Sequence, residues 1–182
     1  MPGIASQKIE KLLETPELPE LGPGPREGIR PEKDMNRAAD KLFGSTNLPD
    51  EKQQLIRALV LLWHDQLDAA HKIVQDVENS DGAFVHGIVH RREPDYGNAA
   101  YWFRRAGRHA AFSEIANRVR VLLEAKGERE LLGKLIPGGE WDAFAFIDAC
   151  GQGNQNSNSE RTQILREIQA VETKELIEWF CK

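Results

Sequence analysis

Four of the five histidines lie close together in the chain, at His64, His71, His86 and His90. Neutral imidazole is a common ligand of zinc and of other first-row divalent metals, which bind about three protein side chains. A helix over this region would bring His86 and His90, four positions apart, to one face, and Glu93 extends the same stripe. The pattern therefore predicts a divalent-metal site, in which the metal could activate a water molecule.

A helical hairpin can supply the third imidazole. A turn is predicted at residues 79–80, between two helices that would pack antiparallel. This register sets His71 between His86 and His90 along the helix axis. The predicted metal ligands are therefore His71, His86 and His90, with Glu93 or His64 as a further ligand. A divalent metal such as zinc is the only cofactor that the sequence predicts.

The same histidines also have a purely structural interpretation. Histidines on packed helices often bind a main-chain carbonyl or a carboxylate, and four acids are close enough in sequence to do so: Asp65, Asp68, Asp81 and Asp95. The spacing also differs from that of the metalloprotease helix, because Gly87 follows His86 where a glutamate base would stand. Both interpretations remain open at the level of sequence.

A cluster of arginines overlaps the histidines: Arg91, Arg92, Arg104, Arg105 and Arg108. Arg92 would project into the apolar arc of its helix, where an unpaired charge is costly. We therefore expect a partner for Arg92, with Glu93, Asp95 and Asp81 as candidates. The guanidinium would then serve either as a structural ion pair between helices or as a clamp for a carboxylate or phosphate.

The next predicted helix places polar side chains together on the side away from its small residues. Together with the preceding arginines they form a predicted site for a small anionic ligand, made of Arg91, Arg92, Asn98, Tyr101 and Arg105. The alternative is a solvated basic face, because unpaired surface charge is weak evidence for a site.

The composition predicts a soluble globular protein located in the cytoplasm. The chain has 182 residues, of which 40% are hydrophobic and 29% charged, enough for one domain with a core. A net charge of -5 argues against nucleic acid and anionic membranes as partners. No signal peptide or membrane-spanning run is visible. Cys150 and Cys181 have no metal-like spacing, and no phosphate loop, dinucleotide fingerprint or serine elbow is present, so the sequence assigns no reaction.

The apolar spacing is helical throughout and nowhere alternates as in a strand, so the predicted fold class is all-α. We expect one domain of antiparallel hairpins around a central helix at 49–63, which is apolar nearly all round. Residues 1–34 would form an N-terminal helix and a Pro/Gly-rich connector, and residues 35–182 the helical domain, with the histidine and arginine motif at 64–109.

The other predicted helices are 6–14, 31–43, 67–78, 82–92, 95–107, 112–125, 128–136, 141–149 and 160–181. Asp65 and Asp95 are predicted N-caps of the helices that follow them. Residues 151–159 are polar and of low complexity, and we expect an exposed loop there.

Residues 95–107, DYGNAAYWFRRAG, resemble the second helix of a Sel1-like repeat, a relative of the tetratricopeptide repeat. The matching features are the opening acid and aromatic, Asp95 and Tyr96, the small Ala99, and the closing run at 102–106. The resemblance implies helical hairpins and a protein-interaction module, with a protein as partner. Gly97 and Tyr101 depart from the pattern, and fewer than three repeats are visible, so an extended solenoid is not expected.

The longer string HRREPDYGNAAYWFRR also resembles a set of uncharacterised bacterial proteins, which implies no activity. Two functions of different classes therefore compete. One is a site for a metal or a small anionic ligand, built on the three histidines. The other is an interaction module in which the same residues are structural or line a peptide groove.

Overall fold

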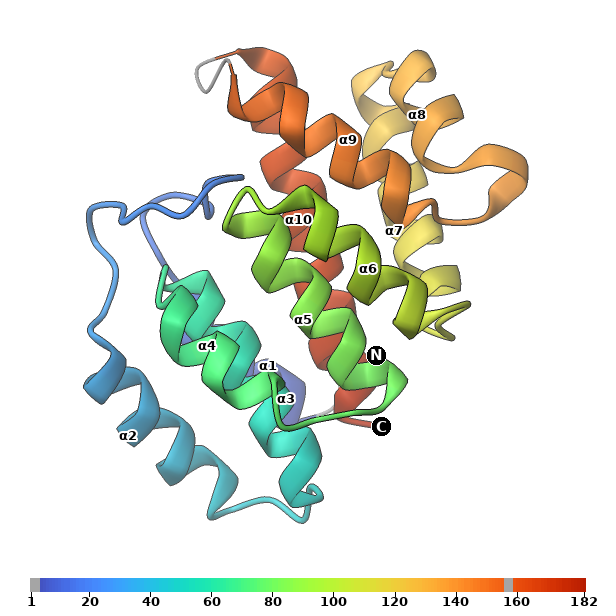
Figure 1. The fold of residues 1–182 in the computed structure, drawn as a ribbon. Coiled ribbons are helices and arrows are strands. Elements are labelled where there is room, and N and C mark those ends of the chain that lie inside the picture. Colours follow the sequence, from blue (N-terminus) through green and yellow to red (C-terminus); the bar gives the residue numbers. More distant parts are fainter. Residues whose placement is uncertain (1–3, 156–158) are drawn as a thin grey trace.

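The computed structural model describes residues 4–155 and 159–182, and over that range its secondary structure is entirely helical, which confirms the predicted fold class (Figure 1). The elements are α1 (Ile4–Glu10), η1 (Lys11–Leu13), α2 (Glu32–Phe43), α3 (Asp50–Trp63), α4 (Leu67–Val74), α5 (Ser80–Arg92), α6 (Tyr96–Ala106), α7 (Phe112–Lys126), α8 (Arg129–Leu135), η2 (Pro137–Gly139), α9 (Ala143–Asn154) and α10 (Glu160–Phe180).

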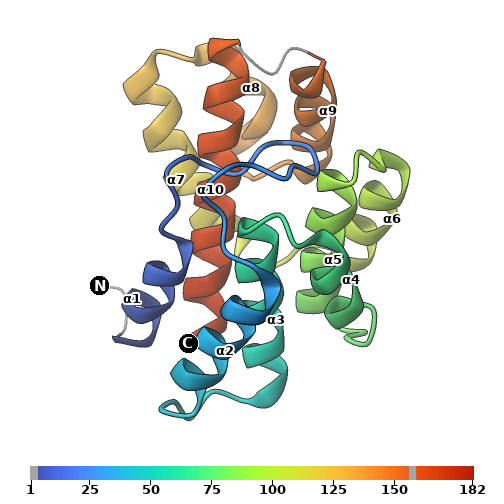
Figure 2. The same cartoon turned by 90° about the vertical axis from the view of Figure 1, so that its left-hand side faces the viewer.

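Two helices occupy the centre of the molecule. The predicted central helix, α3, is buried continuously from Ala58 to Trp63, as its apolar sequence requires. The second, α10, runs through the middle of the molecule and packs against α1, α3, α7 and α9 (Figure 2). Its central position was not predicted, because it buries polar residues such as Gln169 and Glu172 that obscure its apolar stripe.

The helices α3 and α4 form one hairpin, and α5 and α6 form the next (Figure 1). Asp95 caps α6 as predicted, accepting a hydrogen bond from the Asn98 main-chain N–H at 3.3 Å. The predicted cap at Asp65 is wrong. This residue takes a left-handed conformation with φ of 57°, and its carboxylate turns inward to accept the main-chain N–H of Arg26 at 2.9 Å. Helix α4 also ends at Val74, earlier than expected.

The expected loop at 151–159 is partly wrong, because α9 continues through Gly151 to Asn154. Close packing explains Gly153. A Cβ atom there would lie 2.7 Å from Leu21 Cδ1 and 2.9 Å from Leu165 Cδ1, so a larger residue would force these buried side chains to shift. The Asn154 amide donates to the Tyr96 hydroxyl at 2.8 Å, which holds this last turn against α6. Residues 156–158 of the predicted loop lie outside the described part of the chain.

The Pro/Gly-rich connector before α2 packs against the domain. Leu21 is buried in the common core, and Gln169 donates to the Glu20 carbonyl at 2.9 Å. Arg166 donates to the carbonyls of Pro19, at 3.2 Å, and Leu18. These bonds come from α10, so the connector is held by the same central helix as the rest of the fold.

Within the described residues, no helix combines the length and the apolar character that crossing a bilayer requires.

Candidate metal centre

Three imidazoles meet where α4 packs on α5. His71, His86 and His90 each offer one ring nitrogen, and these three atoms all lie within 4.8 Å of one another. The ring centroid of His71 is 4.8 Å from those of both His86 and His90, so it lies between them as the hairpin register predicted. The rings of His86 and His90 stack one turn apart on α5, with centroids 4.9 Å apart and planes at 11°. The predicted convergence of the three histidines is confirmed.

Glu93 lies on the outer side of two of these rings. The His71 Nδ1 donates to Glu93 Oε1 at 3.2 Å. The His90 Nδ1 lies 3.1 Å from Glu93 Oε2, within ion-pair distance but without the angle of a hydrogen bond. The carboxylate therefore contacts imidazoles on two helices, but Glu93 is not among the residues whose ligand atoms converge. Glu93 thus occupies the position of a carboxylate that orients metal-binding histidines, whereas the sequence predicted it as a direct metal ligand.

A single proton lies between the two closest rings. The Nε2 atoms of His71 and His86 form a hydrogen bond of 2.9 Å, which requires one of them to carry hydrogen and the other a free lone pair. The His86 Nδ1 is buried and has no hydrogen-bond partner in the described structure. A divalent metal could replace this shared proton, because metal ions bind the deprotonated imidazole nitrogen.

The scaffold holds His86 and His90 in a buried position. Asn79 caps α5 by accepting the Gly82 N–H at 2.9 Å, which sets where the helix begins. On the far side of His86 the indole of Trp102 stacks on the imidazole, with ring centroids 3.8 Å apart and planes at 17°. His86 and His90 are buried, whereas the His71 side chain is 33% exposed and gives the cluster its contact with solvent.

Burial and mutual repulsion keep the two α5 histidines neutral. Burial, which has the largest effect, and the neighbouring rings of His71 and His90 together lower the pKa of His86 to about 4. The pKa of His90 is also lowered, by burial first, although Glu93 opposes the shift. Neutral imidazole is the form that binds metal, so both rings are ready to act as ligands at neutral pH.

The structure places His64 away from this cluster. Its ring is fully buried, its Nε2 donates to the Leu12 carbonyl at 2.7 Å, and its Nδ1 accepts the Arg30 N–H at 3.1 Å. Both nitrogens are thus engaged by the N-terminal connector, and burial lowers the pKa of the ring. His64 was predicted as a further metal ligand, but its role here is to fasten the connector to the end of α3.

The predicted arginine clamp is not formed, because both arginines on α5 are paired inside the core. Arg91 forms two bonds to the Glu172 carboxylate, one of them at 3.1 Å. Arg92 donates to Asp65 Oδ1 at 2.7 Å and to two main-chain carbonyls. The expectation that Arg92 must be paired is confirmed, but its partner is Asp65, which was not among the candidates. Glu93 is instead engaged by the histidines.

The other three residues of the predicted ligand site lie on the surface. Asn98 bonds the Asp95 carboxylate at 2.7 Å, and Tyr101 is 44% exposed. The guanidinium of Arg105 lies 5.9 Å from the Tyr101 ring and 5.4 Å from the Trp102 ring. The structure therefore separates Arg91 and Arg92, which are paired in the core, from the three surface residues that the sequence grouped with them.

Sequence reasoning missed a second cluster, in which the buried His109 is hydrogen-bonded to Asp81. The His109 Nδ1 accepts the Ala111 N–H at 3.1 Å, so the proton is on Nε2, which donates to Asp81 at 2.7 Å. Lys52 and Trp179 also donate to this carboxylate. Burial opposes its ionisation, but the bonds from His109 and Lys52 prevail and lower the pKa of Asp81 to about 2. No local pattern reveals this cluster, because its members come from α3, α5, α10 and the α6–α7 turn.

No protein-family model matches this chain, and neither the curated proteins nor the solved structures contain a significant match to it. The resemblance to Sel1-like hairpins and to the bacterial proteins therefore stays a prediction.

Proposed function

We propose that this protein binds a divalent transition metal, such as zinc, through His71, His86 and His90. The observation that carries the proposal is the convergence of three ring nitrogens within 4.8 Å. Tetrahedral zinc with metal–nitrogen bonds of about 2.0–2.1 Å holds its ligand atoms roughly 3.3 Å apart. Small ring movements would close the difference, and His71 has room to move because its side chain is one of the more exposed in the cluster.

The contacts of Glu93 with two of the histidines are a second observation that supports this proposal. Metal-binding histidines almost always donate their outer N–H to a carboxylate, a carbonyl or a water, which fixes the tautomer and the ring orientation. The Glu93 carboxylate stands against the Nδ1 atoms of both His71 and His90. The bond from the His71 Nδ1 directs its Nε2 to the centre, where it meets the His86 Nε2 at 2.9 Å.

The proposed site leaves one coordination position open. Three protein ligands with a water in the fourth position are typical of zinc sites that do chemistry, whereas structural sites have four protein ligands. Solvent reaches the cluster beside His71, so a bound water is accessible. A ligand set made only of imidazoles also suits copper, nickel and iron, so we propose the class of metal ion and use zinc as the probe.

We expect moderate affinity. When His86 binds metal through Nε2, its proton moves to Nδ1, and this buried atom has no acceptor among the residues described. Loss of such an outer partner typically costs about 10–100-fold in metal affinity. The site should therefore bind zinc more weakly than one in which every outer nitrogen is bonded.

The test is zinc binding by the full chain, prepared without chelator for elemental analysis and then stripped and titrated calorimetrically. We expect one zinc per chain, with release of protons on binding. The variant His71→Ala should lose affinity by more than the roughly 100-fold that follows from loss of an outer partner. His71 is the best choice because it is the least buried ligand. The buried ligands are tested by His86→Ala and His90→Ala, with circular dichroism to check that each variant is folded.

His64→Gln is the matched control, because it removes an imidazole that lies outside the cluster and leaves an amide able to donate to Leu12. It should bind zinc as the unaltered protein does. Binding that is substoichiometric, or that survives in His71→Ala, would rule out the proposed centre.

A further inference from the structure

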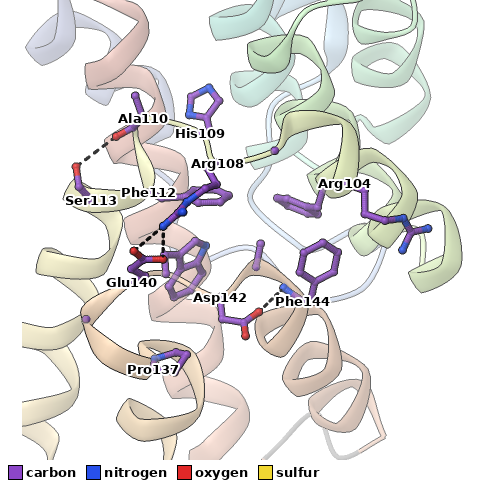
Figure 3. A pocket seen from close by; sticks show the side chains of 15 residues that line it. Arg104, Arg108, His109, Ala110, Phe112, Ser113, Pro137, Glu140, Asp142 and Phe144 are labelled. Atoms are coloured by element: carbon purple, nitrogen blue, oxygen red, sulfur yellow. Dashed lines mark hydrogen bonds and ion pairs between the residues drawn. The ribbon is translucent and has the colours of Figure 1, made fainter.

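A separate cavity of about 690 Å³ lies between the α6–α7 turn, the start of α7, η2 and the start of α9 (Figure 3). Small-molecule sites are typically about 300–1,000 Å³ in volume, mostly apolar, with a few polar groups. Four residues with apolar aromatic rings contribute to this lining, and they are Phe103, Phe112, Trp141 and Phe144. The first two lie on α6 and α7, and the second two flank the start of α9. Phe144 is 43% exposed, so an aromatic surface faces the opening.

The start of α7, which also lines the cavity, has no side-chain cap at Ala111. The partial positive charge of a helix N-terminus favours a negatively charged group beside it. Trp141 is only 4% exposed and its Nε1 is enclosed by protein, so its indole contributes an apolar wall to the cavity.

A guanidinium stands at the opening. Figure 3 shows Arg108 reaching from the α6–α7 turn to Glu140, which it binds at 2.7 Å and 3.0 Å. The Arg108 side chain is 87% exposed, and an ion pair in such a position contributes little to stability. Arg108 can therefore exchange Glu140 for the carboxylate of a ligand. Asp142, the other acid in the lining, is already bonded to the N–H groups of Phe144 and Ala145.

The cavity is suited to binding and not to hydrolysis. His109 and Ser113 both line it, which places a histidine and a hydroxyl near each other. Both ring nitrogens of His109 are engaged, however, by Asp81 and by the Ala111 N–H. The Ser113 hydroxyl donates to the Ala110 carbonyl at 3.3 Å. No free imidazole nitrogen remains to act as a base for this serine.

We propose that this cavity binds a small aromatic carboxylate. Its ring packs among Phe112, Trp141 and Phe144, and its carboxylate accepts hydrogen bonds from the Arg108 guanidinium. The site is independent of the metal centre, since the two share no residue.

The test is calorimetric titration of the full chain with naphthoate, compared with naphthalenemethanol, which has the same ring and no charge. We expect saturable binding of one naphthoate per chain and at least tenfold weaker binding of the alcohol. Arg108→Gln removes the guanidinium, and a hydrogen bond to a charged group corresponds to about tenfold or more in affinity. This variant should therefore bind naphthoate at least about tenfold more weakly and bind the alcohol unchanged.

Val121→Ala is the control, because Val121 is 65% exposed on α7 and does not line the cavity. It should bind naphthoate as the unaltered protein does, and circular dichroism checks that all variants are folded. Absence of saturable binding would overturn the proposal, and so would equal affinity for the alcohol. Unchanged naphthoate affinity in Arg108→Gln would show that the ligand binds elsewhere and overturn it as well.

Discussion

The Nε2 atoms of His71 and His86 lie 2.9 Å apart, although the two residues are 15 positions apart in the chain. The contact joins α4 to α5 across the turn at 75–79. It depends on the register of the hairpin, because a shift of one residue on either helix would rotate its ring away by about 100°. The same register sets His71 against His90 and against Glu93, so one packing arrangement assembles the whole candidate centre.

The role of Glu93 gives the first prediction. Glu93→Gln removes the negative charge that orients His71 and His90 but preserves the shape of the side chain. We expect zinc affinity to fall by about 10–100-fold, with the stoichiometry unchanged, because the three ligands remain. Competition calorimetry measures the change. Glu124→Gln, on the exposed side of α7, should leave the affinity unaltered, and a full loss of binding in Glu93→Gln would identify Glu93 as a direct ligand.

The second prediction concerns the buried ion pair of Arg91 and Glu172, whose side chains are both fully buried. Arg91→Met leaves the Glu172 carboxylate without its partner and should lower the free energy of unfolding by about 3–5 kcal/mol. The double variant Arg91→Met, Glu172→Leu removes both charges and should recover most of this loss. Urea unfolding measures both effects. If the double variant is as unstable as the single one, this prediction is wrong, and the ion pair stabilises the protein by more than the cost of one unpaired charge.

The third prediction concerns stability in acid. The pKa of Asp81 is about 2 in the folded protein against an ordinary value of 3.8, so folding favours its ionised form. This contribution is therefore complete above about pH 4 and is lost as the pH falls from about 4 to about 2. The shift corresponds to about 2 kcal/mol, and Asp81→Asn should flatten the acid limb of stability by that amount. Urea unfolding across this pH range is the measurement, and Asp68→Asn, an exposed acid, should retain the normal acid limb.

The fourth prediction compares two helical glycines. A Cβ atom at Gly87 would lie 2.8 Å from the buried Phe103 ring, so either the ring or the helix must shift, and Gly87→Ala should destabilise the protein by about 1–3 kcal/mol. A Cβ at Gly133, in α8, would meet nothing within 4 Å. Gly133→Ala should therefore stabilise the protein, by about 0.5–1 kcal/mol, because alanine loses less backbone entropy in a helix. Thermal unfolding should shift in opposite directions, and shifts of the same sign would contradict the close packing of α5 on α6.

Local periodicity was enough to predict much of the candidate centre. The spacing of His86, His90 and Glu93 placed them on one side of a helix, and the turn at 79–80 placed His71 level with them. Both inferences use only contacts between neighbouring turns or across one short hairpin, where helix geometry leaves little freedom. For the same reason the all-helical fold and the apolar centre at α3 followed from the sequence.

The partners of the other buried polar side chains were decided by tertiary structure alone. Arg92 meets Asp65 from 27 positions away, Arg91 meets Glu172 from 81, and His64 meets Leu12 from 52. The sequence showed that a buried charge needs a partner, because desolvation is costly wherever the charge lies. It could not show which partner, since many acids are compatible with that requirement and only the packing of distant helices brings one of them within reach.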